Sequence, residues 1–203
     1  MKQVILIHGL PNKEEYYESD WPSESNAHWL PWVQREILRK GILCQSLEMP
    51  HPYNPTYKDH CQVLDQMNIN EETILVGHSC GGGFLVRYFS EHKELTPKKI
   101  ILVAPWLDPE EYLNELNSET DFFDFEIDSK LSRRTDIHII YSTDDEKYIL
   151  ESVQQIQQSI SDSKEYKFFN KGHFTEPDLG TKEFPELVEI IIESFSSDKK
   201  YLI

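Results

Sequence analysis

Four short aliphatic runs constrain the fold of this 203-residue chain more than any other feature. The runs are QVILI at 3–7, TILV at 73–76, KIILVA at 99–104 and IHIIY at 137–141. They are continuous rather than alternating, which is typical of strands buried on both faces, as in a parallel sheet. Two weaker runs, ILCQSL at 42–47 and EYKFF at 165–169, bring the number of predicted strands to six.

Segments with helical periodicity lie between the predicted strands. They cover 29–40, 56–67, 81–92, 147–160 and 183–195. This alternation predicts an α/β fold: a three-layer, doubly wound domain around a mostly parallel six-stranded sheet. In such folds ligands bind at the carboxyl ends of the strands, so functional residues are expected there.

The length of the chain predicts one domain spanning 1–203, and neither an internal repeat nor a linker composition divides it. The acidic segment 105–130, which also carries aromatic residues, interrupts the rhythm of strands and helices. Because it follows the carboxyl end of a predicted strand, it could cap a pocket. A solvated insertion with a small apolar underside explains the same composition equally well.

The charge balance excludes two classes of partner. Twenty Lys and Arg residues stand against 36 Asp and Glu residues, which gives a net charge of −16. Such a field repels phosphate backbones and anionic lipid headgroups, so neither nucleic acid nor a membrane is an expected partner.

The three cysteines, Cys44, Cys61 and Cys80, include no C-x-x-C pair. Together with the lack of a signal-peptide core before His8, they predict a cytoplasmic protein.

The sequence G-H-S-C-G at 77–81 directly follows the TILV run and precedes a predicted helix. This is the context of a nucleophile elbow, in which a serine sits on a sharp and strained turn from strand to helix. Gly77 and Gly81 allow the chain to turn that tightly. The pattern predicts Ser79 as a nucleophile and the backbone N–H of Cys80 as a donor to an oxyanion. The alternative is an ordinary glycine-rich turn with a buried serine.

A serine nucleophile needs a base and an acid, which follow it in the order Ser, Asp, His in α/β-hydrolases. His173 follows the last predicted strand and is the predicted base. Asp144 and Asp145 follow the strand before it. Adjacent side chains on extended backbone point in opposite directions, so only one of them can face the imidazole. We favour Asp145 and expect Asp144 to be a turn or capping residue.

A second oxyanion donor is expected from the loop after the first strand, which reads His8-Gly9-Leu10. The backbone N–H of Leu10 is the candidate, because Pro11 has no N–H to donate. The alternative is that this loop only makes a tight turn.

Five motifs occur in a fixed order over nearly the whole chain: H-G after the first strand, W-L-P-W at 29–32, G-H-S-C-G-G, S-T-D-D and G-H-F. In this the chain resembles the small serine hydrolases of the retinoblastoma-binding protein 9 and YdeN type, within the α/β-hydrolase superfamily. The resemblance implies a minimal α/β-hydrolase fold without a large cap domain. It also implies a triad of Ser79, Asp145 and His173.

The sequence therefore predicts a serine hydrolase that needs no cofactor and cleaves ester, thioester or amide bonds of a small acyl substrate. No metal is expected, because the chain has no H-E-x-x-H and no compact ligand spacing. The competing hypothesis is an interaction protein that keeps the fold, has an idle triad and contacts a basic partner through its acidic face.

Overall fold

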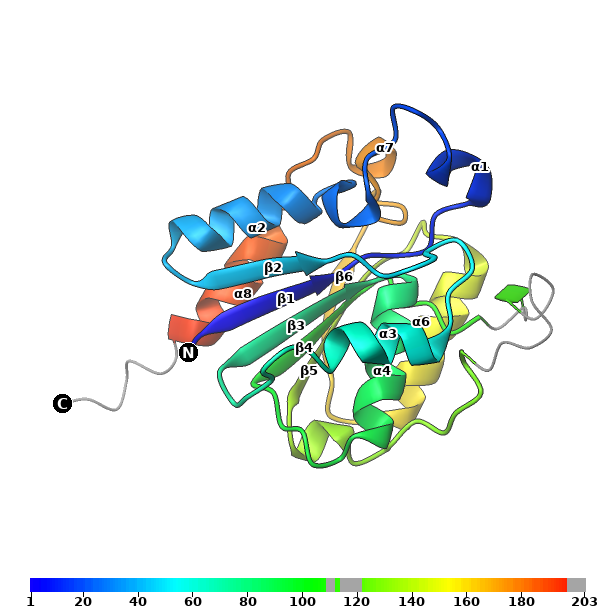
Figure 1. Cartoon of the computed structure of the whole chain (residues 1–203). Coiled ribbons are helices and arrows are strands. Elements are labelled where there is room, and N and C mark those ends of the chain that lie inside the picture. Colours follow the sequence, from blue (N-terminus) through cyan, green and yellow to red (C-terminus); the bar gives the residue numbers. More distant parts are fainter. Residues whose placement is uncertain (109–111, 114–121, 197–203) are drawn as a thin grey trace.

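A six-stranded parallel sheet forms the centre of the computed structural model, which describes residues 1–108, 112–113 and 122–196 (Figure 1). The strands are β1 (Gln3–Ile7), β2 (Leu43–Leu47), β3 (Thr73–His78), β4 (Lys99–Val103), β5 (Asp136–Ser142) and β6 (Lys164–Phe168). Their order across the sheet is β2-β1-β3-β4-β5-β6, and every pairing is parallel. All six predicted strands are therefore confirmed.

The burial of the strands explains why the central ones were the clearest in the sequence. Every residue of β1, β3 and β4 is buried, whereas the edge strands β2 and β6 alternate between exposed and more buried positions. A central parallel strand is covered on both faces and needs apolar residues throughout, while an edge strand meets solvent. This is why 42–47 and 165–169 gave the weaker signals.

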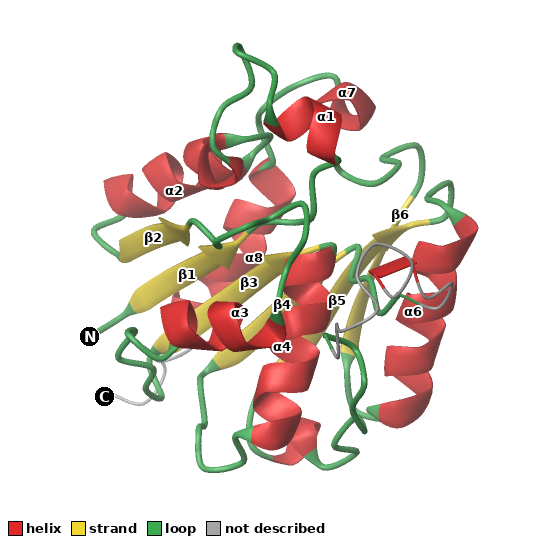
Figure 2. Ribbon diagram, turned by 45° about the vertical axis from the view of Figure 1, so that its right-hand side comes forward, coloured by secondary structure: helices red, strands yellow, loops and turns green. Residues whose placement is uncertain are grey.

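Helices cover both faces of the sheet, as the α/β pattern predicts (Figures 1 and 2). One face carries α2 (Leu30–Arg39) and α8 (Pro185–Ser196), and the other carries α3 (Tyr57–Leu64), α4 (Cys80–Glu91) and α6 (Lys147–Ser159). The bounds differ from the predicted ranges by up to three residues. No helix of the described residues is long and apolar enough to cross a membrane.

Short helices that the sequence analysis did not predict lie at the end of the molecule to which the strand carboxyl ends point. These are α1 (Lys13–Tyr16) and α7 (Glu176–Leu179), and a 3-10 turn at Glu24–Asn26 lies in the same connection as α1 (Figure 2). One helical turn is too short to show a period of 3.6 residues, so the hydrophobic periodicity that predicts long helices does not reveal α1 or α7.

The acidic segment 105–130 lies partly outside the described residues, which omit 109–111 and 114–121. The part that is described contributes to the core: Trp106, Leu107 and Phe122 are buried, and the Phe122 ring packs edge-on against His60 of α3. These buried residues fit a capping segment and an insertion with an apolar underside alike. That the segment caps a pocket stays a prediction.

Candidate active site

Ser79 occupies the turn between β3 and α4, with φ 52° and ψ −119°. A positive φ at a residue other than glycine costs about 1–3 kcal/mol and persists only where the surroundings enforce it. Here the Ser79 N–H donates to the Val103 carbonyl at 2.9 Å, and the Ser79 carbonyl accepts from the N–H groups of Gly82, Gly83 and Trp106. The backbone on both sides of Ser79 therefore holds the strained conformation.

Two glycines allow this turn because there is no room for a side chain at either of them. A Cβ atom on Gly77 would lie 2.6 Å from the carbonyl carbon of Gly81. A Cβ atom on Gly81 would lie 2.8 Å from the Ile7 carbonyl oxygen. Both separations are far below van der Waals contact, so β1, β3 and α4 can approach this closely only with glycine at 77 and 81.

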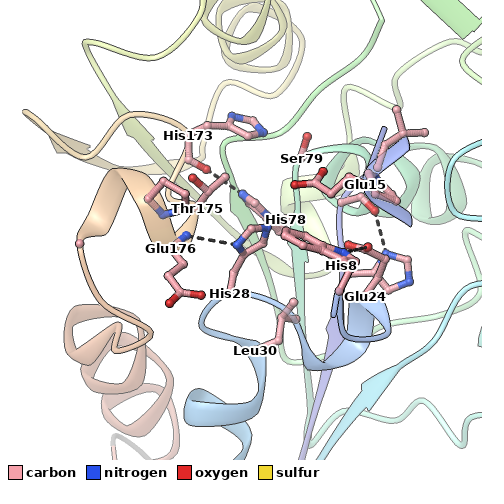
Figure 3. A pocket seen from close by; sticks show the side chains of 16 residues that line it. His8, Glu15, Glu24, His28, Leu30, His78, Ser79, His173, Thr175 and Glu176 are labelled. Atoms are coloured by element: carbon pink, nitrogen blue, oxygen red, sulfur yellow. Dashed lines mark hydrogen bonds between the residues drawn. The ribbon is translucent and has the colours of Figure 1, made fainter. Parts of the chain in front are cut away.

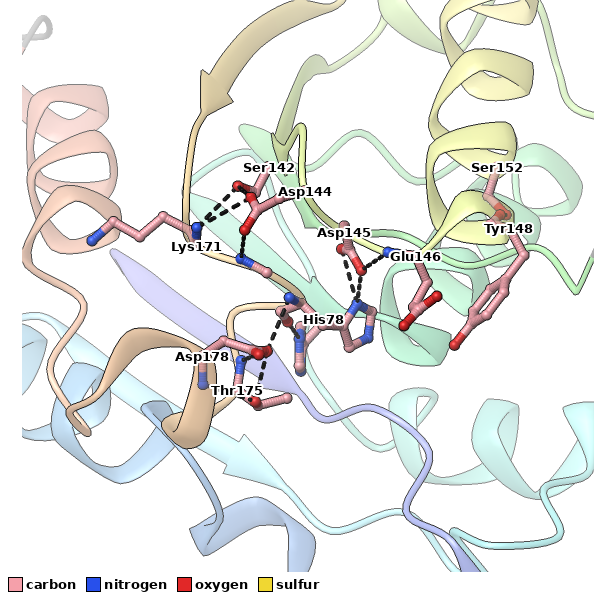
Figure 4. A network of polar contacts seen from close by, with 12 residues as sticks. His78, Ser142, Asp144, Asp145, Glu146, Tyr148, Ser152, Lys171, Thr175 and Asp178 are labelled. Carbon is pink, nitrogen blue, oxygen red and sulfur yellow. Dashed lines mark hydrogen bonds and ion pairs between the residues drawn. The ribbon is translucent and has the colours of Figure 1, made fainter.

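Asp145, in the turn after β5 (Figure 4), contacts His173, which lies in the loop after β6. The imidazole Nδ1 lies 3.1 and 3.0 Å from the two carboxylate oxygens of Asp145. The Asp145 side chain is fully buried, whereas that of His173 is 27% exposed. The Glu146 N–H donates to the same carboxylate at 2.7 Å and holds it in place. With Nδ1 facing the carboxylate, Nε2 is the ring nitrogen left for a substrate or a nucleophile.

Asp144 has a different environment from its neighbour. Its carboxylate accepts hydrogen bonds from the Ser142 hydroxyl and from the N–H groups of Lys171 and Gly172. These hydrogen bonds, that of Ser142 foremost, lower the pKa of Asp144. Asp144 thus ties the turn after β5 to the loop that carries His173, while Asp145 faces the imidazole.

Ser79 and His173 line the same hollow, one from the elbow and the other from the loop after β6 (Figure 3). No hydrogen bond joins the Ser79 hydroxyl to the His173 ring among the described residues. Hydrogen bonds between catalytic groups are often long before substrate binds and tighten in the complex.

His78 makes a contact that no pattern in the sequence predicts. Its Nε2–H donates a hydrogen bond of 2.8 Å to the backbone carbonyl of His173, and the two rings lie 5.0 Å apart between centroids. Burial holds the pKa of His78 well below its usual value, so the ring is neutral and this nitrogen can act as a fixed donor. The elbow is thereby connected directly to the loop of His173.

His8 fixes the peptide that precedes Leu10. The Met49 N–H donates to Nε2 of His8 at 2.9 Å, so the proton of the neutral ring is on Nδ1, which donates to the Gly9 carbonyl at 2.7 Å. In a trans peptide the carbonyl and the following N–H point in opposite directions. The hydrogen bond from His8 therefore also sets the direction of the Leu10 N–H.

The loop of His8, Gly9 and Leu10 lies directly against the elbow. A Cβ atom on Gly9 would be 3.1 Å from the Cβ of Ser79.

On the other side of Ser79, Cys80 begins α4, so its N–H is one of the amides that a helix leaves without an internal acceptor. Burial raises the pKa of the Cys80 thiol, which keeps it protonated.

Two cavities open on this site. The larger has a volume of about 550 Å³ and extends from Ser79 and His173 toward α1 and α7. The smaller, of about 290 Å³, shares Leu10, Ser79 and His173 with it and is otherwise lined by Trp106, Asp108, Tyr112, Tyr148 and Ile149. Among the residues that the structure describes, no three His, Cys, Asp or Glu side chains are grouped so as to hold a metal ion.

A parallel six-stranded sheet with a serine on the turn from its third strand to the following helix is the α/β-hydrolase fold. The sequence pattern of the family described as "Serine hydrolase" matches residues 19–193. The chain belongs to this serine hydrolase family.

Sequence identity and structural similarity to other proteins support this membership. The chain is 30% identical to YdeN of Bacillus subtilis (strain 168) over 206 residues, which cover 98% of this chain and 99% of YdeN. It is 26% identical over 171 residues to the serine hydrolase RBBP9 of Rattus norvegicus, with 80% of this chain and 84% of RBBP9 covered. The crystal structure of the ydeN gene product superimposes with a TM-score of 0.77 at 26% identity, and the match covers 97% of this chain and 100% of that one.

Proposed function

We propose that this protein cleaves ester, thioester or amide bonds of a small substrate through an acyl-enzyme on Ser79. The observation that carries the proposal is the contact of the His173 Nδ1 with both carboxylate oxygens of the buried Asp145. This contact assigns the proton of the neutral ring to Nδ1, which leaves an unprotonated Nε2 at the cavity that Ser79 also lines. An unprotonated imidazole nitrogen beside a serine is the base that a serine nucleophile requires.

The reaction begins when the Ser79 oxygen bonds to the carbonyl carbon of the substrate. The hydroxyl proton moves to Nε2 of His173, and the electron pair of the carbonyl double bond moves to its oxygen. Asp145 stabilises the resulting imidazolium and remains ionised. The tetrahedral intermediate then collapses, the bond to the leaving group breaks, and Nε2 returns the proton to that group. Water repeats these steps on the acyl-enzyme and releases the acid.

The backbone N–H groups of Leu10 and Cys80 are the proposed donors to the oxyanion. Both belong to residues next to Ser79 in space, and one of them starts a helix, whose dipole favours negative charge at that end. His8 supports the proposal through its hydrogen bond to the Gly9 carbonyl, because this bond orients the Leu10 amide before substrate arrives. Loss of one such donor typically costs about 10²- to 10³-fold in kcat.

A fluorophosphonate probe tests the proposal, because it reacts only with an activated serine. We expect the intact protein to be labelled, Ser79→Ala to lose all labelling, and Ser132→Ala, which removes a serine near the opposite end of β5, to be labelled as well as the parent protein. A folded protein that resists the probe would contradict the proposal and favour an interaction protein with an idle triad.

A further inference from the structure

The larger cavity carries an unbalanced negative charge. Three carboxylates line it, Glu15 from α1, Glu24 from the 3-10 turn and Glu176 from α7, and its described lining includes no Lys or Arg. The histidines His8, His28 and His78 also line it, but burial lowers the pKa of each, so at neutral pH they are uncharged and do not offset the carboxylates. Lys182 pairs with Glu176 at 3.5 Å from outside the cavity, so among the described residues Glu15 and Glu24 are the two carboxylates of the lining without a cationic partner.

Glu24 is the carboxylate whose environment indicates a ligand. The residue is only 3% exposed and lines the cavity. The Trp21 Nε1–H donates to its Oε1 at 2.7 Å, and no described residue donates to Oε2. Burial, with the nearby charges of Glu48 and Glu15, raises the pKa of Glu24 to about 7. Because Oε2 has no donor among the described residues, a cationic group in the cavity would pair with this carboxylate and lower its pKa.

The position of His173 indicates which part of a substrate enters this cavity. Nε2 returns its proton to the leaving group, so the leaving group lies on the side of the His173 loop. The residues after His173 that line a cavity, Thr175, Glu176, Pro177 and Gly180, all line the larger one and none lines the smaller. The larger cavity is therefore the side of the leaving group.

The smaller cavity suits the acyl group. Its lining includes the apolar side chains of Trp106 and Ile149. Among the lining residues that the structure describes, Asp108 carries the one carboxylate, which already accepts the N–H groups of Tyr112 and Leu113 at 2.6 and 2.8 Å. A volume of about 290 Å³ accommodates a short acyl chain such as a butyryl group.

Building on the serine hydrolase function proposed above, we propose that the substrate joins a short apolar acyl group to a leaving group that carries a protonated amine. The ammonium group donates to Glu24 and lies near Glu15. Trp21, which lines the same cavity and is held by its hydrogen bond to Glu24, adds an aromatic face for the cation. Esters of amino alcohols have this chemistry.

Two esters of one acid test the inference: 2-(dimethylamino)ethyl butyrate and 3-methylbutyl butyrate, which have the same shape but differ in charge at pH 7.5. We expect the intact protein to favour the cationic ester by at least about tenfold in kcat/KM, since a close ion pair at a desolvated site contributes more than about 1.4 kcal/mol. Glu24→Gln keeps the size of the side chain and removes its charge. It should lower the ratio of the two kcat/KM values about tenfold.

The matched control is Glu14→Gln, because Glu14 is exposed on the same helix as Glu15 and does not line the cavity. This variant should keep the parent ratio. Glu15→Gln, at a half-exposed position, provides a second variant in case Glu24→Gln does not fold, and it should lower the ratio about two- to fivefold.

The outcomes separate this inference from the proposed function. If Ser79-dependent hydrolysis occurs but the two esters are cleaved equally well, or if Glu24→Gln and Glu15→Gln leave the ratio unchanged, the cationic leaving group is wrong while the hydrolase stands. If neither ester is cleaved and the fluorophosphonate does not label Ser79, both proposals are overturned.

Discussion

The Nε2–H of His78 donates a 2.8 Å hydrogen bond to the backbone carbonyl of His173, across 95 residues of sequence. Since His78 is the residue before Ser79, the proposed nucleophile and the proposed base are connected by a hydrogen bond that uses neither of their side chains. Asp145 orients the ring of His173, whereas His78 positions its backbone. The distance from Ser79 to Nε2 thus depends on both contacts.

Replacing His78 should therefore lower the rate of acyl transfer without weakening the binding of substrate. We expect His78→Leu to reduce kcat on a butyrate ester by about 10- to 100-fold with little change in KM, because displacement of a catalytic group by about 1 Å has effects of this size. His78→Gln, which retains an N–H donor, should recover most of the loss. An equal fall in kcat for His78→Leu and His78→Gln would contradict the positioning of the His173 backbone by this hydrogen bond.

Substitutions of the two adjacent aspartates should have different effects. Asp145→Asn removes the charge that faces the imidazole and should lower kcat by about 10³- to 10⁴-fold, as expected for the acid of a triad. Asp144→Asn retains an oxygen acceptor for the N–H groups of Lys171 and Gly172, so it should lower kcat by less than about tenfold. Steady-state kinetics on one ester measure both. Reversed effects would assign the acid to Asp144.

Gly81→Ala should prevent the elbow from forming. The added methyl group would lie 2.8 Å from the Ile7 carbonyl, so β1 and α4 would have to separate, and we expect a loss of at least about 3 kcal/mol in the free energy of unfolding. Gly41→Ala is the matched control, because Gly41 has a φ of +75° but no atom within 4 Å of an added Cβ. It should cost only about 1–2 kcal/mol of backbone strain. Urea denaturation distinguishes the two, and equal losses would show that close packing at the elbow is not the cause.

Glu24 should also make the stability of the protein depend on pH. Its pKa is raised from 4.5 to about 7 in the folded state, so between these values the folded protein keeps a proton that the unfolded chain has lost. Protonated Glu24 therefore makes its full contribution to the free energy of unfolding below pH 4.5, and this contribution is lost as the pH rises through 7. Relative to Glu24→Gln, the parent protein should lose on the order of 1–3 kcal/mol between pH 5 and pH 8. Urea midpoints at the two pH values give the difference, and parallel pH profiles would contradict it.

The strands and long helices could be predicted from the sequence because each has a local pattern. A strand buried on both faces, such as 99–104, needs a continuous apolar run, and the helix at 147–160 needs a period of 3.6 residues. The elbow was predictable for the same reason, since Gly77, Ser79 and Gly81 are close in sequence and the steric requirement is local.

Contacts between distant segments left no such pattern. Two such contacts arise only when the chain has folded. One is the hydrogen bond from His78 to the carbonyl of His173, and the other is the cavity that Glu24 and residues of α7 line together. Neither His78 nor any residue of 11–27 is among the site residues that the sequence predicts. The neighbours of His78 and Glu24 in the folded chain, rather than their residue types, determine the role of each residue.

The cavity wall and the proposed triad come from two separate parts of the sequence. The wall that carries Glu15, Trp21 and Glu24 comes from the connection between β1 and α2, whereas the proposed nucleophile, acid and base come from residues 79 to 173. Residues 11–28 belong to no strand, so the charge of this wall can change without a substitution in the sheet or at the proposed triad. On the proposed function, altering this one surface connection would change which substrates are preferred while the residues of acyl transfer stay the same.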